Sequence, residues 1–383
     1  MPRRWPPLNT RVLTVVLLVG LPVLVIGIGI VLSIGRYRLK EAQGERLAEM
    51  AEYMAASVDA YVFRSILDAS VLARVPDIRQ AAARGNERPF DKRAALELDR
   101  QWLRDPADSA ERSSLLDSSA SRFLADLARN DSVKREILVT DRHGRLVAAS
   151  NVTTDYFQAD EEWWRQAFDE GRGRVSVSDV RHDASAGVYA FEIAVPVPAL
   201  SDNELAGVMK IVADSREMLT GIGGVEFGAT AEAMLVRSNG SIVFRRRPHT
   251  EGDRFFAADL LREQLETRAS RKEPPGPLRF DAAAPDGTGR LVVVAPSQLG
   301  RSFPVLAWFV ALSVDQDELL APFRSLVWYL LLAFALTAIA VLAIALWLSL
   351  RLAAPTIDSA VEMHLVDHAQ PDAGYADGPD TKP

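Results

Sequence analysis

The chain has 383 residues, of which 48% are hydrophobic and 25% charged, and its formal net charge is −7 at pH 7. It contains no cysteine, which excludes disulfides, thiolate catalysis, cysteine-ligated zinc and iron–sulfur clusters. An acidic balance without a cluster of Lys and Arg in a folded segment argues against nucleic acid as a partner. Two uncharged apolar runs flank a long polar segment, which indicates a membrane protein with a large water-facing domain.

The first apolar run, residues 12–35, contains no charged residue. A helix of this length crosses the roughly 30 Å of hydrocarbon in a bilayer. A cleaved signal peptide is the alternative, but it has a shorter apolar region and a small-x-small cleavage site. We therefore expect an uncleaved transmembrane helix over 12–35, kinked at Pro22, with a cytoplasmic N-terminus over 1–11.

The next segment, residues 36–80, has the pattern of one long amphipathic helix that leaves the membrane on the domain side. Its apolar residues recur at steps of three and four, as in Leu47, Met50, Met54, Val58 and Tyr61. We expect this stripe to pack against the domain or against a second copy of the chain.

Two β-hairpins are predicted about a hundred residues apart. Residues 136–150 hold two apolar runs around a turn at Gly144, and residues 233–244 hold two more around Asn239-Gly240. Helices over 94–103 and 114–128 precede the first hairpin.

Each hairpin is followed by a helix and then by a pair of strands. The expected elements are 160–170, 187–197 and 205–213 after the first, and 257–267, 289–295 and 305–314 after the second. The order occurs twice, so the sequence predicts an α+β fold of two related modules in tandem with antiparallel sheets.

A second transmembrane helix is expected over 325–350, which is uncharged and has Trp328, Tyr329 and Trp347 near its ends. Arg and Lys flank both spans on both sides, so the charge count leaves the topology open. Long loops cross the membrane largely regardless of charge, so we expect the central segment outside and both termini in the cytoplasm. Residues 351–383 begin like the first turn of a HAMP relay helix and continue as a polar, disordered tail.

The order of short motifs between the spans resembles the double Cache sensor domain, a PAS-like fold of bacterial chemoreceptors and membrane-bound kinases. The motifs are Asp155-Tyr156, Glu162-Trp163-Trp164, 175–180, 193–197 and Gly207-Val208-Met209, followed by 307–317. The resemblance implies a membrane-distal Cache module over 81–220 and a membrane-proximal one over 221–324. It also implies a bacterial inner-membrane protein with a periplasmic domain.

The same resemblance points to ligand-binding residues in the distal module. Family members that bind amino acids have a Tyr, an Arg just before an aromatic pair, and an Asp after the late Gly-Val strand. This chain keeps Tyr156, Trp163 and Trp164, but Glu161 stands at the Arg position and Val212 at the Asp position.

These departures argue against the usual amino-acid clamp. Carboxylates beside two indole rings favour a small cationic or amine ligand. The alternative is that both Trp side chains fill the core while the acids form a solvated helix start.

Further candidates lie later in the same module. Asp179, Arg181 and Asp183, with His182 among them, stand where the resemblance places a lid or pocket edge, although an ordinary loop is the alternative. Glu192 alternates with small residues on the strand face opposite Phe191, which makes it a pocket candidate.

The motifs of common enzymes are missing from this sequence, which contains no HExxH, GxSxG or P-loop. We therefore expect no enzymatic activity, no metal and no cofactor. No kinase, cyclase or methyl-accepting sequence follows the second span, so we expect signalling through a separate protein partner. The alternative is a non-catalytic structural or accessory subunit of a larger membrane complex.

Overall fold

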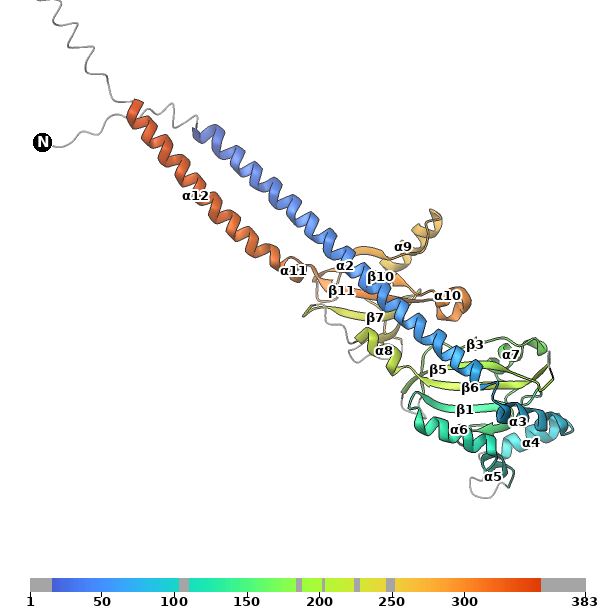
Figure 1. Cartoon of the computed structure of the whole chain (residues 1–383). Coiled ribbons are helices and arrows are strands. Elements are labelled where there is room, and N and C mark those ends of the chain that lie inside the picture. The colour runs from blue at the N-terminus through green and yellow to red at the C-terminus, as the bar shows by residue number, and fades with distance from the viewer. Residues whose placement is uncertain are drawn as a thin grey trace, which may run out of the picture. The chain divides into compact units, whose positions relative to one another are not determined.

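The computed structural model describes residues 16–102, 110–183, 188–201, 204–223, 228–245 and 252–352 (Figure 1). The chain forms two compact units. One comprises residues 40–320, and the other comprises the segments on either side of it. The predicted N-terminus over 1–11 and the tail after residue 352 lie outside the described residues.

The flanking unit consists of two apolar helices. A π-helical turn, η1 (Val16–Gly20), leads into α2 (Leu21–Leu72), and α12 (Ala321–Leu352) supplies the other helix. In the described part of the chain, these two helices are long and apolar enough to cross a membrane. Pro22 is the second residue of α2 and directly follows the π-helical turn.

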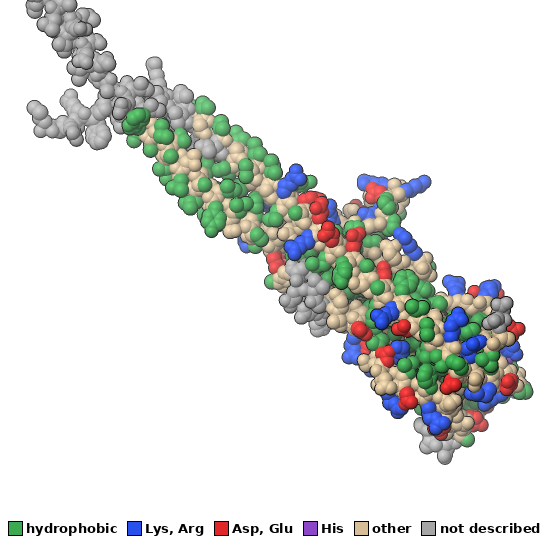
Figure 2. Space-filling view, in the orientation of Figure 1, with side chains coloured by type: hydrophobic (Ala, Val, Ile, Leu, Met, Phe, Trp, Pro, Cys, Tyr) green, Lys and Arg blue, Asp and Glu red, His purple; other side chains and the backbone are tan. Residues whose placement is uncertain are grey.

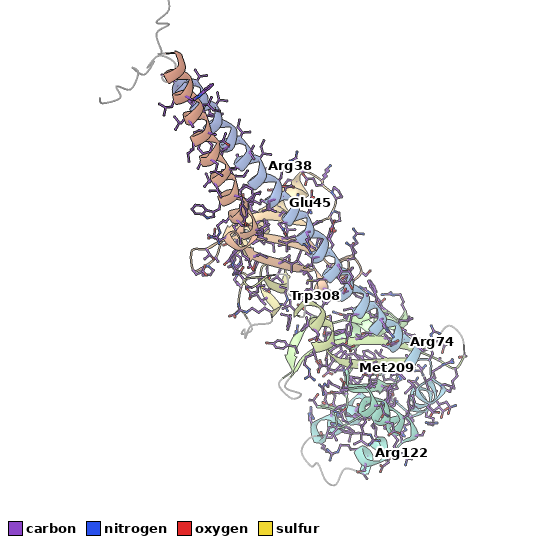
Figure 3. All side chains as sticks on the ribbon, turned by 60° about the vertical axis from the view of Figure 1, so that its left-hand side comes forward. Arg38, Glu45, Arg74, Arg122, Met209 and Trp308 are labelled. Atoms are coloured by element: carbon purple, nitrogen blue, oxygen red, sulfur yellow. The ribbon has the colours of Figure 1, made fainter. Side chains whose placement is uncertain are left out.

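The first part of α2, up to Leu39, lies beside α12 within this unit (Figures 1 and 3). The ring of Phe323 packs against Gly35, where an added Cβ would lie 2.8 Å from the ring atom Cε2. Hydrophobic side chains cover both helices, whereas charged side chains gather on the other unit (Figure 2).

Residues 40–320 contain two antiparallel sheets. The first has the strand order β2-β1-β6-β5-β3, and β4 also pairs with β5. Its strands are β1 (Lys134–Thr140), β2 (Leu146–Ala149), β3 (Ser176–Val177), β4 (Arg181–Asp183), β5 (Val188–Pro198) and β6 (Leu205–Asp214). The second sheet has the order β8-β7-β11-β10-β9. Its strands are β7 (Glu232–Arg237), β8 (Ile242–Arg245), β9 (Leu278–Ala283), β10 (Gly289–Pro296) and β11 (Trp308–Asp315).

The two sheets have the same connectivity. In each, the first strand of the hairpin pairs with the last strand, which pairs with the strand before it. The hairpin turns also match, because Gly144 and Gly240 both have positive φ angles, of 83° and 81°. The carbonyls of these two glycines accept equivalent hydrogen bonds, from Gln158 N and Phe255 N, both at 2.8 Å. The α+β fold with repeated antiparallel sheets is therefore confirmed.

The later part of α2 packs against one face of both sheets. Its buried side chains recur at helical spacing, as in Leu47, Ala51, Met54, Val58 and Val62, and they share one core cluster with residues of both sheets. The buried carboxylate of Asp59 fixes α2 to the end of β10, because it accepts hydrogen bonds from Ser297 Oγ at 2.5 Å and Gln298 N at 2.8 Å.

Helices also cover the opposite face of each sheet. On the first sheet these are α4 (Lys92–Gln101), α5 (Ala110–Leu116) and α7 (Glu162–Phe168), and on the second sheet it is α9 (Ala258–Ser270). Short helices connect the remaining segments: η2 (Asp169–Gly171), α8 (Arg216–Gly223), α10 (Leu299–Ser302), η3 (Pro304–Leu306) and α11 (Gln316–Leu319).

Two predicted helices are each divided in two. The helix expected over 36–80 ends at Leu72, and α3 (Pro76–Glu87) begins at a proline. Proline forces the residue before it out of the helical region, and Val75 is extended, with φ −61° and ψ 133°. The helix expected over 114–128 is divided between α5 and α6 (Ser119–Asn130), because the Ser118 side chain accepts a hydrogen bond from Ser121 N and caps α6.

Candidate functional site

Charged side chains lie on the helix-covered face of the first sheet. Strand alternation places Phe191, Ile193 and Val195 in the core against α2 and turns Glu192 to the opposite face. On β6 the same alternation turns Lys210 to that face, between Met209 and Ile211 of the α2-facing core. Helix α7 crosses this face and places Trp163 and Trp164 over it.

Trp164 is a core residue. Its side chain is 6% exposed, its Nε1 donates to Thr140 Oγ1 at 2.9 Å, and its ring stacks on Phe168 at a centroid distance of 4.6 Å. Trp163 belongs to the same core cluster and is 9% exposed. For Trp164 the structure therefore favours the core interpretation.

Lys210 lies between an indole and a carboxylate. Its Nζ is 4.8 Å from the centroid of the Trp163 ring and 3.2 Å from Glu192 Oε1. The Lys210 side chain is 12% exposed and that of Glu192 is 36% exposed. An ammonium group of the chain itself thus occupies the surroundings that the sequence predicts for a cationic ligand.

Sequence reasoning missed Lys210, although a lysine inside an otherwise apolar strand was a visible signal. Val212, at the position expected for an amine-binding Asp, is buried and stands in register with Glu136 on β1 and Glu192 on β5. The carboxylates beside position 212 therefore belong to Glu136 of β1 and Glu192 of β5, and position 212 itself supplies none.

Acidic residues accumulate at the start of α7. Partial burial raises the pKa of Glu161 above its ordinary value, and the charges of Asp155 and Asp160 act in the same direction, while Lys210 opposes them. Burial also raises the pKa of Asp155, although the Gln158 side chain donates to its carboxylate. Glu161 is the N-cap residue of α7 but makes no side-chain capping hydrogen bond. Clusters of perturbed acids of this kind mark candidate binding sites.

Tyr156 lies apart from the Lys210 surroundings. Its ring is tilted against Trp102 at a centroid distance of 5.3 Å, its backbone N donates to Asp99 Oδ1 at 2.8 Å, and its side chain lines a separate cavity. Burial raises the pKa of the Tyr156 hydroxyl.

Asp179 connects the two sheets. Its Oδ2 is 2.6 Å from Arg237 Nε, and its Oδ1 accepts a hydrogen bond from Trp308 Nε1 at 3.0 Å. Arg181 and Asp183 do not form part of a loop, because residues 181–183 are the short strand β4, paired with β5. Arg181 is exposed.

The charges on the helix-covered face of the second sheet lie at one end of its strands, where Arg290 is 2.8 Å from Asp315 and 3.8 Å from Glu232. The centre of that face is apolar. Val294 of β10 and Ala311 of β11 stand in register there, as Ala194 of β5 and Lys210 of β6 do in the first sheet. The central lysine and its acidic partner are thus a property of the first sheet. In the described part of the chain, no group of three or more His, Asp and Glu side chains could hold a metal ion.

The structure is an α+β protein in which two sheets of the same connectivity share one long helix, with a charged cluster on the first sheet. No protein-family model matches this chain, and no curated protein matches it in sequence.

Solved structures that the chain resembles include ligand-binding and sensory domains of chemoreceptors. The domain of the Pseudomonas aeruginosa amino acid chemoreceptor PctB, in complex with L-Arg, is 18% identical. That match covers 85% of this chain and 99% of the other, with a TM-score of 0.42. The domain of PctC from the same organism, in complex with GABA, is 15% identical and matches over 71% and 100% of the two chains, with a TM-score of 0.43. The sensory domain of Campylobacter jejuni Tlp3 is 9% identical over 74% and 98%, with a TM-score of 0.46.

Proposed function

We propose that this chain is a two-span inner-membrane protein whose double Cache domain lies in the periplasm, senses a small molecule and signals through a separate protein. One observation carries the proposal: both sheets pack on α2, which continues into the first apolar segment, and β11 leads through α11 into the second. A shift of the first sheet against α2 would therefore be passed along continuous helices.

We place the ligand site at Glu161, Trp163, Glu192 and Lys210. Ions under a covering helix lose hydration, and an apolar side chain would avoid that cost, as Val294 and Ala311 do at the centre of the second sheet. A small amine ligand would compete with the Lys210 ammonium for Glu192 and the Trp163 ring, and so would release Lys210.

Glu192 also contacts the residue before Asp179, whose side chain links the two sheets. Its backbone N donates to Ser178 Oγ at 2.8 Å, and its carbonyl accepts from Ser178 N at 2.9 Å. The next residue, Asp179, binds Trp308, which is the first residue of β11. These contacts form a continuous path from the proposed site to the strand before the second apolar helix.

A thermal-unfolding screen of the full chain in lipid nanodiscs tests this proposal. The screen covers amines, amino acids, organic acids and purines. A sensor gains stability with at least one class, because a ligand that binds only the folded state stabilises it. Glu192→Gln should abolish the gain with an amine, whereas Glu162→Gln, an exposed neighbour on α7, should retain it. Equal gains in both variants would remove Glu192 from the site.

The accessory-subunit function is favoured by a different observation. Lys210 already neutralises Glu192, and both Trp side chains already fill the core, so the face is complete without a ligand. Under this function, mild detergent extraction recovers the chain at fixed stoichiometry with a larger assembly, and the screen gives no stabilisation.

A further inference from the structure

A cavity beside the first sheet lies away from the Lys210 cluster. Its volume is about 430 Å³, and it is lined by residues of α3, α4, α5 and strand β2. Its polar lining side chains are Arg84, Arg88, Glu111, Ser114, Ser118 and Tyr156. Glu161, Trp163, Glu192 and Lys210 do not line it, so the two places are chemically separate.

Two arginines line the cavity at the C-terminal end of α3. Arg84 lies in the last turn of this helix, and Arg88 is its C-cap residue, with extended backbone angles of φ −78° and ψ 132°. Neither guanidinium has an ion pair or a side-chain hydrogen bond to another residue that the structure describes. Since both side chains line the cavity, they give this wall a local excess of positive charge.

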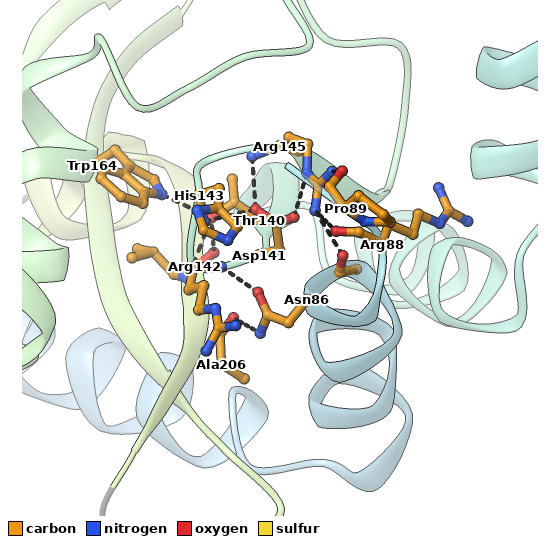
Figure 4. A network of polar contacts seen from close by, with 12 residues as sticks. Asn86, Arg88, Pro89, Thr140, Asp141, Arg142, His143, Arg145, Trp164 and Ala206 are labelled. Atoms are coloured by element: carbon orange, nitrogen blue, oxygen red, sulfur yellow. Dashed lines mark hydrogen bonds and ion pairs between the residues drawn. The ribbon is translucent and has the colours of Figure 1, made fainter. Parts of the chain in front are cut away.

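The backbone that carries these arginines is held rigidly by another residue. Arg145 donates to the carbonyls of Gly85 at 2.8 Å, Arg88 at 3.1 Å and Pro89 at 3.0 Å, and to Asp141 Oδ2 at 2.7 Å (Figure 4). Because Arg145 satisfies the carbonyls that end α3, the Arg88 side chain is not needed as a cap. Figure 4 shows it directed away from this network.

The opposite wall supplies hydroxyl groups and one acid. Ser114 of α5 and Tyr156 face the cavity, while the Ser118 hydroxyl is engaged with Ser121. With Glu111 as the acidic residue of the lining, the two arginines leave a net positive charge. Guanidinium groups bind carboxylate and phosphate oxygens through paired N–H donors, and hydroxyls add single donors.

We propose that this cavity binds a small dianion bearing carboxylate or phosphate groups, held by Arg84 and Arg88 and oriented by the Ser114 and Tyr156 hydroxyls. A volume of about 430 Å³ lies within the range of small-molecule sites. The proposal does not depend on the amine site, because the two sites share no residue.

The test measures binding to the full chain in nanodiscs by titration calorimetry, with inorganic phosphate and succinate as separate probes and a sodium chloride titration at matched ionic strength as the control. We expect saturable binding of at least one dianion, with a heat that sodium chloride does not produce. Binding of phosphate alone would identify a phosphate-bearing ligand, and binding of succinate alone would identify a dicarboxylate. Absence of binding by both overturns the proposal.

Variants locate the site. Arg84→Gln with Arg88→Gln should weaken binding at least tenfold, whereas Arg165→Gln, which removes an exposed arginine of α7 outside the cavity, should leave it unchanged. Arg84→Lys with Arg88→Lys retains the charge and should weaken binding less than the Gln pair, which guards against loss of folding as the cause. Glu192→Gln should leave dianion binding intact. A failure of the proposed amine site can therefore be distinguished from a failure of the dianion site. Unchanged affinity in the Gln pair overturns the proposal.

Discussion

Asp179 and Trp308 are 129 residues apart in the chain, yet the Trp308 indole donates a 3.0 Å hydrogen bond to the Asp179 carboxylate. Trp308 is fully buried, and the other oxygen of Asp179 binds Arg237 at 2.6 Å. One carboxylate on a loop of the first sheet therefore contacts β7 and β11 of the second.

The first prediction concerns this link. Asp179→Asn and Arg237→Gln should each lower the free energy of unfolding by about 1–3 kcal/mol, because each leaves a largely buried charge without its partner. A double-mutant cycle in urea unfolding of the full chain should give a coupling energy of at least about 1 kcal/mol. The exposed pair Asp126 and Arg129 is the control, with an expected coupling of about 0.5 kcal/mol or less. Equal coupling in the two pairs would show that Asp179 is not a specific link.

The second prediction concerns Lys210. Lys210→Met should destabilise the protein by about 1 kcal/mol, because Glu192 loses its partner beneath α7. Adding Glu192→Gln should restore most of this loss, since replacing both members of a partly buried ion pair is often neutral. Thermal unfolding of the two variants and the unmodified chain measures the difference. A double variant that is less stable than Lys210→Met would contradict this prediction.

The third prediction concerns pH. The pKa of Glu161 is raised above its ordinary value of 4.5, so the folded state holds this proton more tightly than the unfolded state. Its contribution to stability is therefore retained below the ordinary pKa and lost as the pH rises through the raised one. Glu161→Gln should remove that loss and make the protein more stable at neutral pH, by less than about 1 kcal/mol because solvent screens this exposed group.

Melting temperatures of Glu161→Gln and the unmodified chain should diverge as the pH rises from about 4 to about 7. Glu162→Gln, on the same turn of α7, provides the control and should follow the unmodified chain. A constant difference between the two melting temperatures across this pH range would contradict the raised pKa of Glu161.

The fourth prediction concerns a close approach between β1 and β6. A Cβ on Gly207 would lie 1.8 Å from the carbonyl oxygen of Thr140, so the backbone would have to move. Gly207→Ala should destabilise the protein by about 3 kcal/mol or more and reduce the yield of folded chain. Gly221→Ala is the matched control, because nothing lies within 4 Å of its added Cβ and the site is helical. It should stabilise by about 0.5–1 kcal/mol.

Much of the fold could be predicted because its signals are local. The turn at Gly144, the alternation around Phe191 and the uncharged run after Arg324 each fix an element within a few residues. The helix predicted over 36–80 was too long, because Pro76 breaks it. Strand β9 was missed because its exposed positions, such as Arg279, weaken the alternating pattern.

The site was less predictable because its partners are distant in sequence. Glu192 was a candidate from alternation alone, but its partner Lys210 is on the next strand, and nothing in the local sequence joins them. Asp179 is a pocket-edge candidate by resemblance alone, and its contact with Arg237 could not be predicted because the two residues are 58 positions apart.

The strand order has a consequence for how the chain acquires its structure. In both sheets the central pair joins the first strand to the last, so β1 meets β6 and β7 meets β11 only after the whole intervening segment is available. Such pairing closes long loops and is slow. Until Asp214 has been synthesised and released, β1 and β2 are a two-strand hairpin with an unpaired edge, which is marginal in water. The hairpin of each sheet is therefore exposed to aggregation and proteolysis until its last strand follows, and chaperones that hold extended chains would act there.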